Sequence, residues 1–276
     1  MSKKVILAFS GGLDTSFCVP YLIDQGYEVH TLFVNTGGIS AKEELAITKR
    51  ANELGAKKHI NLNVEKSLWS EILIPLVQSG ALYQNKYPAL CSDRYLIVKE
   101  SIKLCKKLNT NNVAHGCTGM GNDQIRFDLS IRAHGKYNII TPIREIQNIT
   151  KNVRAYEEDY LRDKGFKVSS LNKKYSINEN LMGATISGSE IDEWKEPSSE
   201  SFVLCKLPHQ YPKKSKALKI KFFKGKVISI NDKKMQGADF LKKLNNLGGS
   251  FGIGRSVFSS DTIIGLKASS LFCFYP

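Results

Sequence analysis

Short apolar runs alternate with stretches of helical periodicity through the first half of the chain. The run at residues 5–9 lies between two lysines and Ser-Gly-Gly, and its length is that of a buried strand. Further strands are expected at residues 28–34, 59–64, 112–115 and 137–140, and helices at residues 14–25, 67–78 and 94–107. This alternation predicts an α/β fold with a parallel, Rossmann-like sheet that has helices on both faces.

The helix that follows the second strand carries its own boundary signals. Ser40 and Glu43 have the spacing of a capping box, in which each side chain bonds to the other residue's backbone N–H. Ile47 and Ala51 then lie on one face of the predicted helix, and Gly55 ends it. We therefore expect this helix to pack one apolar face onto the sheet.

The second half of the chain has a different pattern. Residues 187–216 are rich in Ser, Pro, Glu and Lys, which indicates a surface excursion. Two hairpin strands and a helix are expected after it, at residues 218–223, 226–230 and 238–247. Lys224-Gly225 would form the hairpin turn, and the glycine-rich turn Gly248-Gly249 would follow the helix. These elements predict a second, smaller α+β domain.

Composition narrows the class of protein. With 276 residues, 42% of them hydrophobic, the chain can bury a sizeable core. The net charge of +14 comes mostly from Lys, a pattern more typical of a solvated surface than of base-reading sites, which favour Arg. The six cysteines include no CxxC pair, so neither a zinc site nor a disulfide framework is expected. No apolar stretch approaches the ~20 residues of a membrane span, and we expect a cytoplasmic protein.

The strongest chemical signal lies between the first strand and the first helix, at residues 10–16, with the sequence Ser-Gly-Gly-Leu-Asp-Thr-Ser. Two glycines allow a tight turn, so that successive N–H groups point into one concavity at a helix N-terminus. The hydroxyls of Ser10, Thr15 and Ser16 add further hydrogen-bonding groups. This combination suits a pyrophosphate, although the loop matches neither GxxxxGK[ST] nor GxGxxG. An ordinary strand-to-helix turn is the alternative.

A second cluster occupies residues 114–127, after the strand at residues 112–115. Glycines expose its backbone, while Thr118, Asn122, Asp123 and Arg126 present a hydroxyl, an amide, a carboxylate and a guanidinium. Such a set can hold a zwitterionic amino acid. A glycine-rich loop with a capping Asn is the alternative, but ligand binding is favoured at the carboxyl edge of a parallel sheet.

Both clusters resemble those of one known family. Ser-Gly-Gly-x-Asp is the signature of N-type ATP pyrophosphatases, which adenylate a substrate oxygen and expel pyrophosphate, and residues 8–16 resemble the argininosuccinate synthase version. Residues 115–127 are similar to that family's segment H-G-x-T-G-K-G-N-D-Q-x-R-F. The resemblance implies an ATP-binding domain of the adenine nucleotide alpha hydrolase-like type at residues 1–165. Residues 166–276 would be part of a synthetase and oligomerisation domain.

The resemblance also implies roles for individual residues. Those implied for the nucleotide are Ala8, Phe9, Ser10, Gly11, Gly12, Leu13, Asp14, Thr15, Ser16, Val34 and Gly116. Those implied for citrulline and aspartate are Tyr87, Ser92, Thr118, Asn122, Asp123, Arg126, Ser176 and Thr185. Of these sets, Asp14, Asp123 and Arg126 are taken as catalytic, and no residue is taken as a metal ligand.

The sequence departs from the family pattern in places. Met120 stands where the family usually has Lys, which would remove a charge that could neutralise phosphate. Near the end of the chain, Ser260 or Asp261 and then Phe272 stand where many members have Glu and Tyr in the citrulline site. The family continues past the equivalent of Pro276, so we expect a chain shortened at its C-terminal end.

The activity implied is a ligase of arginine biosynthesis, which joins L-citrulline and L-aspartate by way of a citrullyl-adenylate, with ATP and Mg²⁺ as cofactors. One alternative is a tRNA-thiolating ATP pyrophosphatase, in which Cys91 or Cys117 would be catalytic. Another is a decayed homologue that binds nucleotide without turnover. The partners expected are the two small-molecule substrates, without a membrane or nucleic acid, and the family's homotetramer is in doubt for a shortened chain.

Overall fold

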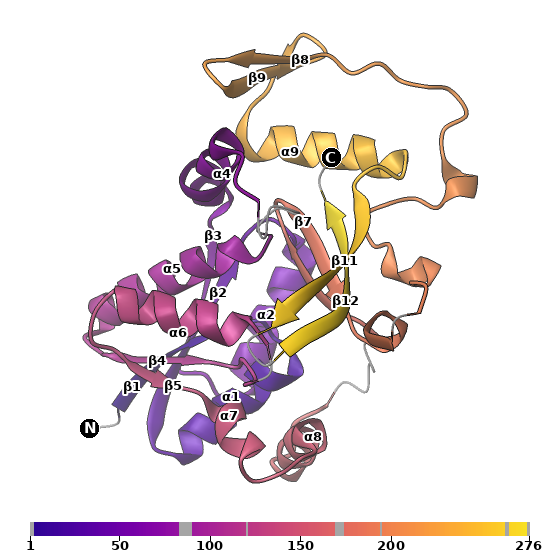
Figure 1. Cartoon of the computed structure of the whole chain (residues 1–276). Helices are drawn as coiled ribbons and strands as arrows, with labels where there is room; N and C mark the ends of the chain where they lie inside the picture. Colours follow the sequence, from indigo (N-terminus) through magenta and orange to yellow (C-terminus); the bar gives the residue numbers. More distant parts are fainter. Residues whose placement is uncertain are drawn as a thin grey trace. The chain divides into compact units, whose positions relative to one another are not determined.

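The computed structural model describes residues 3–82, 90–119, 121–168, 174–193, 195–262 and 265–274, with only the backbone described at residues 90, 258–262 and 265–274. The chain divides into two compact units (Figure 1). The first comprises Met1–Asn35, Ile39–Asn63 and Arg94–Leu171, and the second comprises Thr36–Gly38, Val64–Asp93 and Asn172–Pro276. The domain boundary between residues 165 and 166 stays a proposal.

A five-stranded parallel sheet forms the centre of the first unit, in the order β3-β2-β1-β4-β5. Its strands are β1 (Lys3–Ala8), β2 (Tyr27–Asn35), β3 (Lys58–Asn63), β4 (Asn112–His115) and β5 (Asn138–Ile140). The five strands predicted from the apolar runs are therefore confirmed. At the carboxyl end of the sheet, Ala8 of β1 is in register with Leu32 of β2 and with His115 of β4.

Helices cover both faces of this sheet (Figure 1). They are α1 (Leu13–Asp24), α2 (Ala41–Glu53), α5 (Asp93–Leu108), α6 (Asp123–Ala133), α7 (Pro142–Gln147) and α8 (Val153–Asp163). Val5 and Leu7 of β1 share a core with α1, α2, α7 and α8, whereas α5 and α6 lie over the other face. The capping box of α2 is confirmed, with the Glu43 N–H donating to Ser40 Oγ at 3.3 Å and the Ser40 N–H donating to Glu43 Oε2 at 2.9 Å.

The helix predicted at residues 67–78 is present but not uniform. It consists of α3 (Glu65–Ser67), a π-helical stretch η1 (Leu68–Leu73) and α4 (Ile74–Ser79), and it ends at Gly80 in a left-handed conformation. It belongs to the second unit. Periodicity in the sequence predicted the helix but gave no sign of the wider π-helical turns.

Two antiparallel sheets form much of the second unit. The larger sheet has the order β11-β12-β7-β6, with β6 (Ser176–Asn180), β7 (Gly183–Ser187), β11 (Arg255–Thr262) and β12 (Gly265–Phe274). The smaller has the order β10-β9-β8, with β8 (Ile220–Phe223), β9 (Lys226–Ile230) and β10 (Lys233–Lys234). The predicted hairpin is confirmed, and Lys224 and Gly225 at its turn both have positive φ, as a tight hairpin requires.

Two predictions for the second unit were wrong. Helix α9 (Gly237–Ser250) continues through Gly248 and Gly249 instead of ending in a turn there. The reason is packing: a side chain at Gly249 would overlap the Leu204 carbonyl oxygen, so Gly249 allows the helix a close approach. The segment at residues 187–216 is not purely a surface excursion, because Ile191 and Ser201 within it are fully buried.

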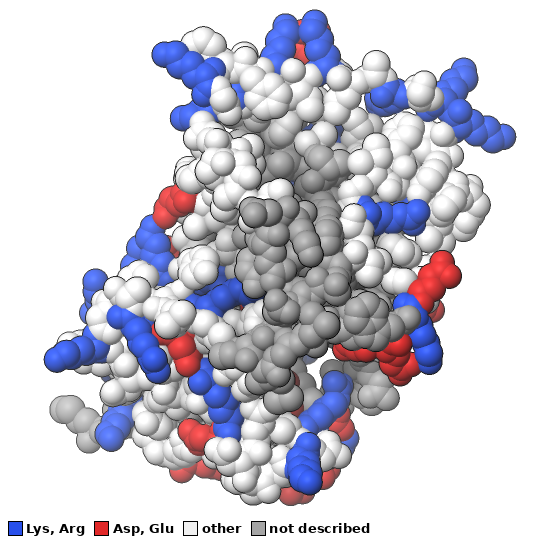
Figure 2. Space-filling view, viewed as in Figure 1, with Lys and Arg blue, Asp and Glu red and all other residues white. Residues whose placement is uncertain are grey.

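Within the described ranges, no helix is both long enough and apolar enough to cross a membrane. Lysines and arginines are scattered among acidic residues over the face drawn in Figure 2. That distribution agrees with the interpretation of the positive charge as a solvated surface.

Candidate functional site

The strand order of the first unit creates one switch point, between β1 and β4. From β1 the chain builds outward through β2 and β3, and it then returns to the other side of β1 to form β4 and β5. Open parallel sheets bind ligands at the carboxyl ends of strands beside such a point. The phosphate loop (residues 9–16) follows β1, and the second loop (residues 116–122) follows β4. Both clusters singled out in the sequence therefore lie at the place where this fold binds ligands.

The two loops touch each other. A Cβ atom placed on Gly116 would lie 3.0 Å from Thr15 Cγ2 and 3.3 Å from the Thr15 nitrogen. A side chain at position 116 would press on Thr15, which would have to move by a few tenths of an ångström to accommodate it. The contact brings together residues implied for the nucleotide that follow two different strands: those of the phosphate loop after β1, and Gly116 after β4.

The phosphate loop has the features of an anion site. Gly11 has a φ of +75°, which suits glycine, and Gly12 is the N-cap residue of α1 without a side chain to accept from the first N–H groups of the helix. These N–H groups and the positive end of the helix dipole are available to an anionic ligand. Ser10 Oγ and Thr15 Oγ1 lie 3.1 Å apart at the same turn.

Asp14 begins the first turn of α1 beside a second carboxyl group. Burial raises the pKa of Asp14, while its own backbone hydrogen bond and the charge of Arg154 oppose the rise. Glu157 of α8 is 1% exposed, and its Oε1 atom has no hydrogen-bond partner among the described residues. Burial, and then the nearby charge of Asp14, raise the pKa of Glu157 to about 8. A negative charge on Glu157 in addition to that on Asp14 is therefore disfavoured.

The second loop is held by side chains from three directions. The Cys117 N–H donates to His115 Nδ1 at 3.2 Å, and the Gly119 N–H donates to Gln147 Oε1 at 2.7 Å. Gln124 Nε2 donates to the Gly119 carbonyl oxygen at 2.7 Å. Sequence reasoning gave no role to His115, Gln124 or Gln147. Gln147 lies 28 residues from Gly119, so no local pattern could have identified that contact.

Asp123 lies between two arginines. Arg94 Nη2 donates to Asp123 Oδ2 at 3.0 Å, and Arg126 Nη1 donates to Asp123 Oδ1 at 2.6 Å. Burial alone would raise the pKa of Asp123, but the charges and hydrogen bonds of Arg94 and Arg126 outweigh it and lower the pKa. The carboxylate is therefore ionised and held in place. It can accept from a ligand ammonium group, while the arginines attract ligand carboxylates.

The remaining residues assigned in the first unit lie near these loops or outside the described residues. Val34 is buried near the end of β2, and Thr118 and Asn122 are half-buried on the second loop, with Asn122 as the N-cap residue of α6. Met120 lies outside the described residues.

In the second unit, the hairpin of β6 and β7 carries two of the assigned residues. Ser176 is in register with Ser187, and Thr185 is in register with Asn178, so all four side chains share one face. Thr185 Oγ1 is buried and has no hydrogen-bond partner among the described residues. On its other side Thr185 is in register with Phe272 of β12. An orphaned buried hydroxyl of this kind calls for an explanation, and a polar ligand would supply it.

Two further residues of the second unit were also assigned to citrulline. Ser92 is 7% exposed, and its Oγ lies 4.0 Å from Met182 Sδ. Tyr87 lies outside the described residues, as do Ile263 and Ile264 near the end of the chain.

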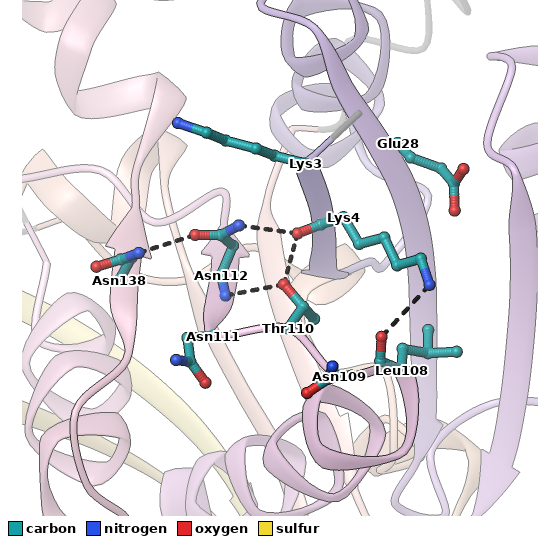
Figure 3. Close-up of a pocket in the computed structure, with 9 residues that line it drawn as sticks. All are labelled: Lys3, Lys4, Glu28, Leu108, Asn109, Thr110, Asn111, Asn112 and Asn138. Atoms are coloured by element: carbon teal, nitrogen blue, oxygen red, sulfur yellow. Dashed lines mark hydrogen bonds between the residues drawn. The ribbon is translucent and has the colours of Figure 1, made fainter. Parts of the chain in front are cut away.

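A pocket lies at the opposite, amino-terminal edge of the sheet (Figure 3). Its polar groups are used to join strand ends: Thr110 Oγ1 and Asn112 Nδ2 both donate to the Lys4 carbonyl oxygen, at 2.7 and 2.9 Å. Asn138 Nδ2 donates to Asn112 Oδ1 at 3.0 Å. These bonds tie β1, β4 and β5 together, and they leave the carboxyl edge as the candidate site.

Comparison with known families decides between the interpretations of that edge. Residues 4–166 match the family model described as the arginosuccinate synthase N-terminal HUP domain, and residues 175–273 match the arginosuccinate synthase C-terminal domain. The chain belongs to the argininosuccinate synthase family. An argininosuccinate synthase of Xanthomonas campestris pv. campestris is 48% identical over 271 residues, which are 98% of this chain and 68% of the relative. One of Xylella fastidiosa is 47% identical, with the same coverage.

Curated members of the argininosuccinate synthase family therefore resemble this chain along nearly its whole length, and the chain spans about two thirds of theirs. The family is enzymatic and forms a C–N bond in arginine biosynthesis. Among solved structures, an NH3-dependent NAD synthetase of Campylobacter jejuni covers 59% of this chain and 65% of its own, at 14% identity and a TM-score of 0.37. That likeness is too low to support a conclusion on function.

The thiolating alternative is not favoured. It requires a reactive thiolate, and burial, with the nearby charge of Asp123, raises the pKa of Cys117 to about 12. A thiol of that pKa stays protonated at neutral pH and is a poor nucleophile. The five cysteines whose side chains are described are all free, and no group of metal-ligating residues occurs in the described part of the chain.

Proposed function

We propose that this chain catalyses the ATP-dependent ligation of L-citrulline and L-aspartate to argininosuccinate, with release of AMP and pyrophosphate. The observation that carries the proposal is the contact between the phosphate loop and the second loop at Gly116 and Thr15. If the first loop binds the phosphates and the second binds the amino acid, the two sites would lie side by side at one switch point, as an enzyme that adenylates one substrate for attack by another requires.

The reaction has two displacement steps. The ureido oxygen of citrulline attacks the α-phosphorus of ATP, an O–P bond forms, and pyrophosphate leaves with the electron pair of the broken bond. The aspartate ammonium group gives up a proton to solvent, and the resulting amine attacks the ureido carbon. AMP leaves with the electron pair of the broken C–O bond, and the nitrogen passes a second proton to AMP or to water. Both steps are accelerated mainly by positioning and by stabilisation of the negative charge that develops.

The residues of the phosphate loop would bind the triphosphate. The N–H groups at the start of α1 point toward the leaving pyrophosphate, and the hydroxyls of Ser10, Thr15 and Ser16 supply further hydrogen bonds. A buried Val34 at the end of β2 offers an apolar contact for the adenine ring. Asp14, in the first turn of α1, would complete the nucleotide contacts.

Asp123 and Arg126 would bind the two amino-acid substrates. The ionised Asp123 accepts from the aspartate ammonium group, Thr118 and Asn122 bind its carboxylates, and Arg126 meets citrulline. Ser92, Ser176 and Thr185 are the further citrulline residues of this proposal, together with Tyr87.

Mg²⁺ fits this chain only as an ion that enters with the nucleotide. The described residues contain no cluster of protein ligands, and Mg²⁺ commonly keeps water and phosphate oxygens as ligands instead of an all-protein cage. Bound in this way, it would neutralise charge on the triphosphate. A cytoplasmic location and a homotetramer of the family type also remain proposals.

The test is AMP formation by the purified protein with citrulline alone, aspartate alone, and both. We expect AMP to accumulate over many turnovers only when both amino acids are present. Gly12→Val should abolish ATP use without unfolding the protein, because Gly12 has a φ of −70° and an added Cβ would meet only Ser10 Oγ at 3.5 Å. Leu45→Val, at an exposed position of α2, is the control. Unchanged ATP affinity in Gly12→Val would refute the assignment of the phosphate loop.

A further inference from the structure

His115 is the last residue of β4, and it lies at the centre of a hydrogen-bonded group. It is 1% exposed, and its ring packs against that of Phe127 with the centroids 5.1 Å apart. Its Nε2 atom lies 2.9 Å from Asp128 Oδ1, and Arg144 donates to both oxygens of Asp128, at 2.8 and 2.9 Å. The carboxylate is therefore fixed from two sides, and it fixes the imidazole ring in turn.

The hydrogen bonds determine the tautomer of this ring. The Cys117 N–H can only donate, so His115 Nδ1, at 3.2 Å from it, must be the acceptor and carry no proton. Nε2 then carries the proton and donates to Asp128 Oδ1 at 2.9 Å. Arg144 Nη2, which can only donate, also lies 3.3 Å from Nε2, but its shorter bond, at 2.8 Å, goes to Asp128 Oδ1. His115 is thus neutral, with its two nitrogens committed to opposite roles.

The hydrogen bond between Cys117 and His115 restrains the backbone of Gly116, which lies between them in the sequence. Gly116 lies against the backbone of Thr15 so closely that an added Cβ would be 3.0 Å from the Thr15 side chain. The Cys117 bond to His115 closes the turn around Gly116, and the register of Ala8 with His115 places that turn directly beside the start of the phosphate loop. A loss of the bond would let the Gly116 turn move relative to the phosphate loop.

We propose that His115 is a positioning residue of the nucleotide site: its unprotonated Nδ1 holds the Gly116 turn in place against the phosphate loop. The inference rests on the proposed function for its significance, because a loop of this kind matters only if a nucleotide binds beside it. It concerns a side chain that need not touch the nucleotide itself.

The arrangement is sensitive to acid. A proton on Nδ1 would turn the acceptor into a donor that faces the Cys117 N–H. The charged and titratable groups near the ring are Asp128 and Asp123 of α6, Arg144 of α7 and the Cys117 thiol. Burial lowers the pKa of His115 below its ordinary 6.5, although Asp128 opposes the shift. Protonation, and the loss of the bond, should therefore occur only below that pH.

Two substitutions separate the roles of the ring nitrogens. In His115→Asn the amide oxygen can take the place of Nδ1 and accept from the Cys117 N–H, whereas His115→Gln places its amide near Nε2 and can only contact Asp128. We expect ATP to bind His115→Asn within about threefold of the wild-type affinity, and to bind His115→Gln about tenfold more weakly, which is the cost of one lost hydrogen bond. Isothermal titration calorimetry with ATP between pH 5 and 8 measures both.

The pH dependence supplies the second comparison. Wild-type affinity should fall on the acid side relative to His115→Asn, whose amide does not titrate in this range. Equal affinities of the two variants for ATP would overturn the proposal. Because the calorimetry needs no turnover, a wild-type protein that binds ATP but makes no AMP would refute the ligase proposal and leave this one standing.

If either variant fails to fold, the ¹⁵N shifts of the wild-type histidine ring decide. They should report Nδ1 unprotonated and Nε2 protonated at neutral pH, and a change only below 6.5. An Nδ1-protonated ring at neutral pH would overturn the assignment.

Discussion

Glu157 should make the stability of this protein fall as the pH rises through the neutral range. The carboxyl group is 1% exposed on α8, Oε1 has no partner among the described residues, and burial followed by the charge of Asp14 raises its pKa from 4.5 to about 8. Between these values the unfolded chain loses this proton while the folded chain keeps it. The folded state thus binds more protons there, and its stability decreases as pH increases.

The size of the effect follows from the pKa difference. A shift from 4.5 to about 8 corresponds to about 5 kcal/mol at most, at 1.36 kcal/mol for each pKa unit. Structural relaxation around an ionised Glu157 would reduce this. The contribution is fully present below pH 4.5, declines between 4.5 and 8, and is absent at higher pH.

Glu157→Gln removes the titration and keeps the shape of the side chain. Urea unfolding at pH 5.5 and at pH 8.5 should show that the variant loses less stability between the two pH values than the wild type, by several kcal/mol. Asp159→Asn is the matched control, since that carboxyl is on the same helix and 70% exposed. If Glu157→Gln and the wild type lose the same stability between these pH values, Glu157 is ionised in the folded state and the reasoning is wrong.

Three further predictions concern other parts of the molecule. Gly249→Ala should cost more than about 2 kcal/mol of unfolding free energy in urea because its Cβ would overlap the Leu204 carbonyl oxygen, while Lys243→Ala, on the exposed side of α9, should cost under about 0.5 kcal/mol. Thr185→Val should leave stability almost unchanged, since Thr185 Oγ1 has no hydrogen-bond partner among the side chains that the structure describes, but should raise the KM for citrulline; an unchanged KM would remove Thr185 from the site. Asn122→Ala should raise the KM for aspartate more than that for ATP, and equal effects would mean that Asn122 only shapes the loop.

The sequence predicted the first unit well because its signals are local. Each strand of the parallel sheet is a compact apolar run, and Ser40 and Glu43 specify the start of α2 within one turn. The order of the strands, and with it the switch point, came from the structure, but a ligand site at the carboxyl ends of the strands follows from general rules of open parallel sheets. The position of the phosphate loop could therefore be predicted from residues 5–16 alone.

The failures arose where distant packing decides the local structure. Gly248-Gly249 reads as a turn in isolation, yet the Leu204 backbone lies where a side chain at Gly249 would be, and that glycine is there for contact and not for flexibility. The Gly119 N–H donates to the side chain of Gln147 in α7, and no sequence motif marks Gln147 as its partner. The geometry of a site, as opposed to its place, depends on such long-range contacts.

The two loops at the switch point also differ in how firmly they are held, and this difference suits their proposed roles. Within the phosphate loop, the hydrogen bonds made by the hydroxyls of Ser10, Thr15 and Ser16 are long, from 3.1 to 3.4 Å. In the second loop, the two bonds at Gly119 are 2.7 Å, although the bond from Cys117 to His115 is 3.2 Å. At the start of α6, the bond from Arg126 to Asp123 is 2.6 Å. Weak internal bonds can be exchanged for phosphate oxygens at little cost, whereas short bonds keep an acceptor fixed before the ligand arrives. If the two loops bind ATP and the attacking amino acid as proposed, the energetic demand of binding ATP is kept low on one side, and the position of the amino acid is set in advance on the other.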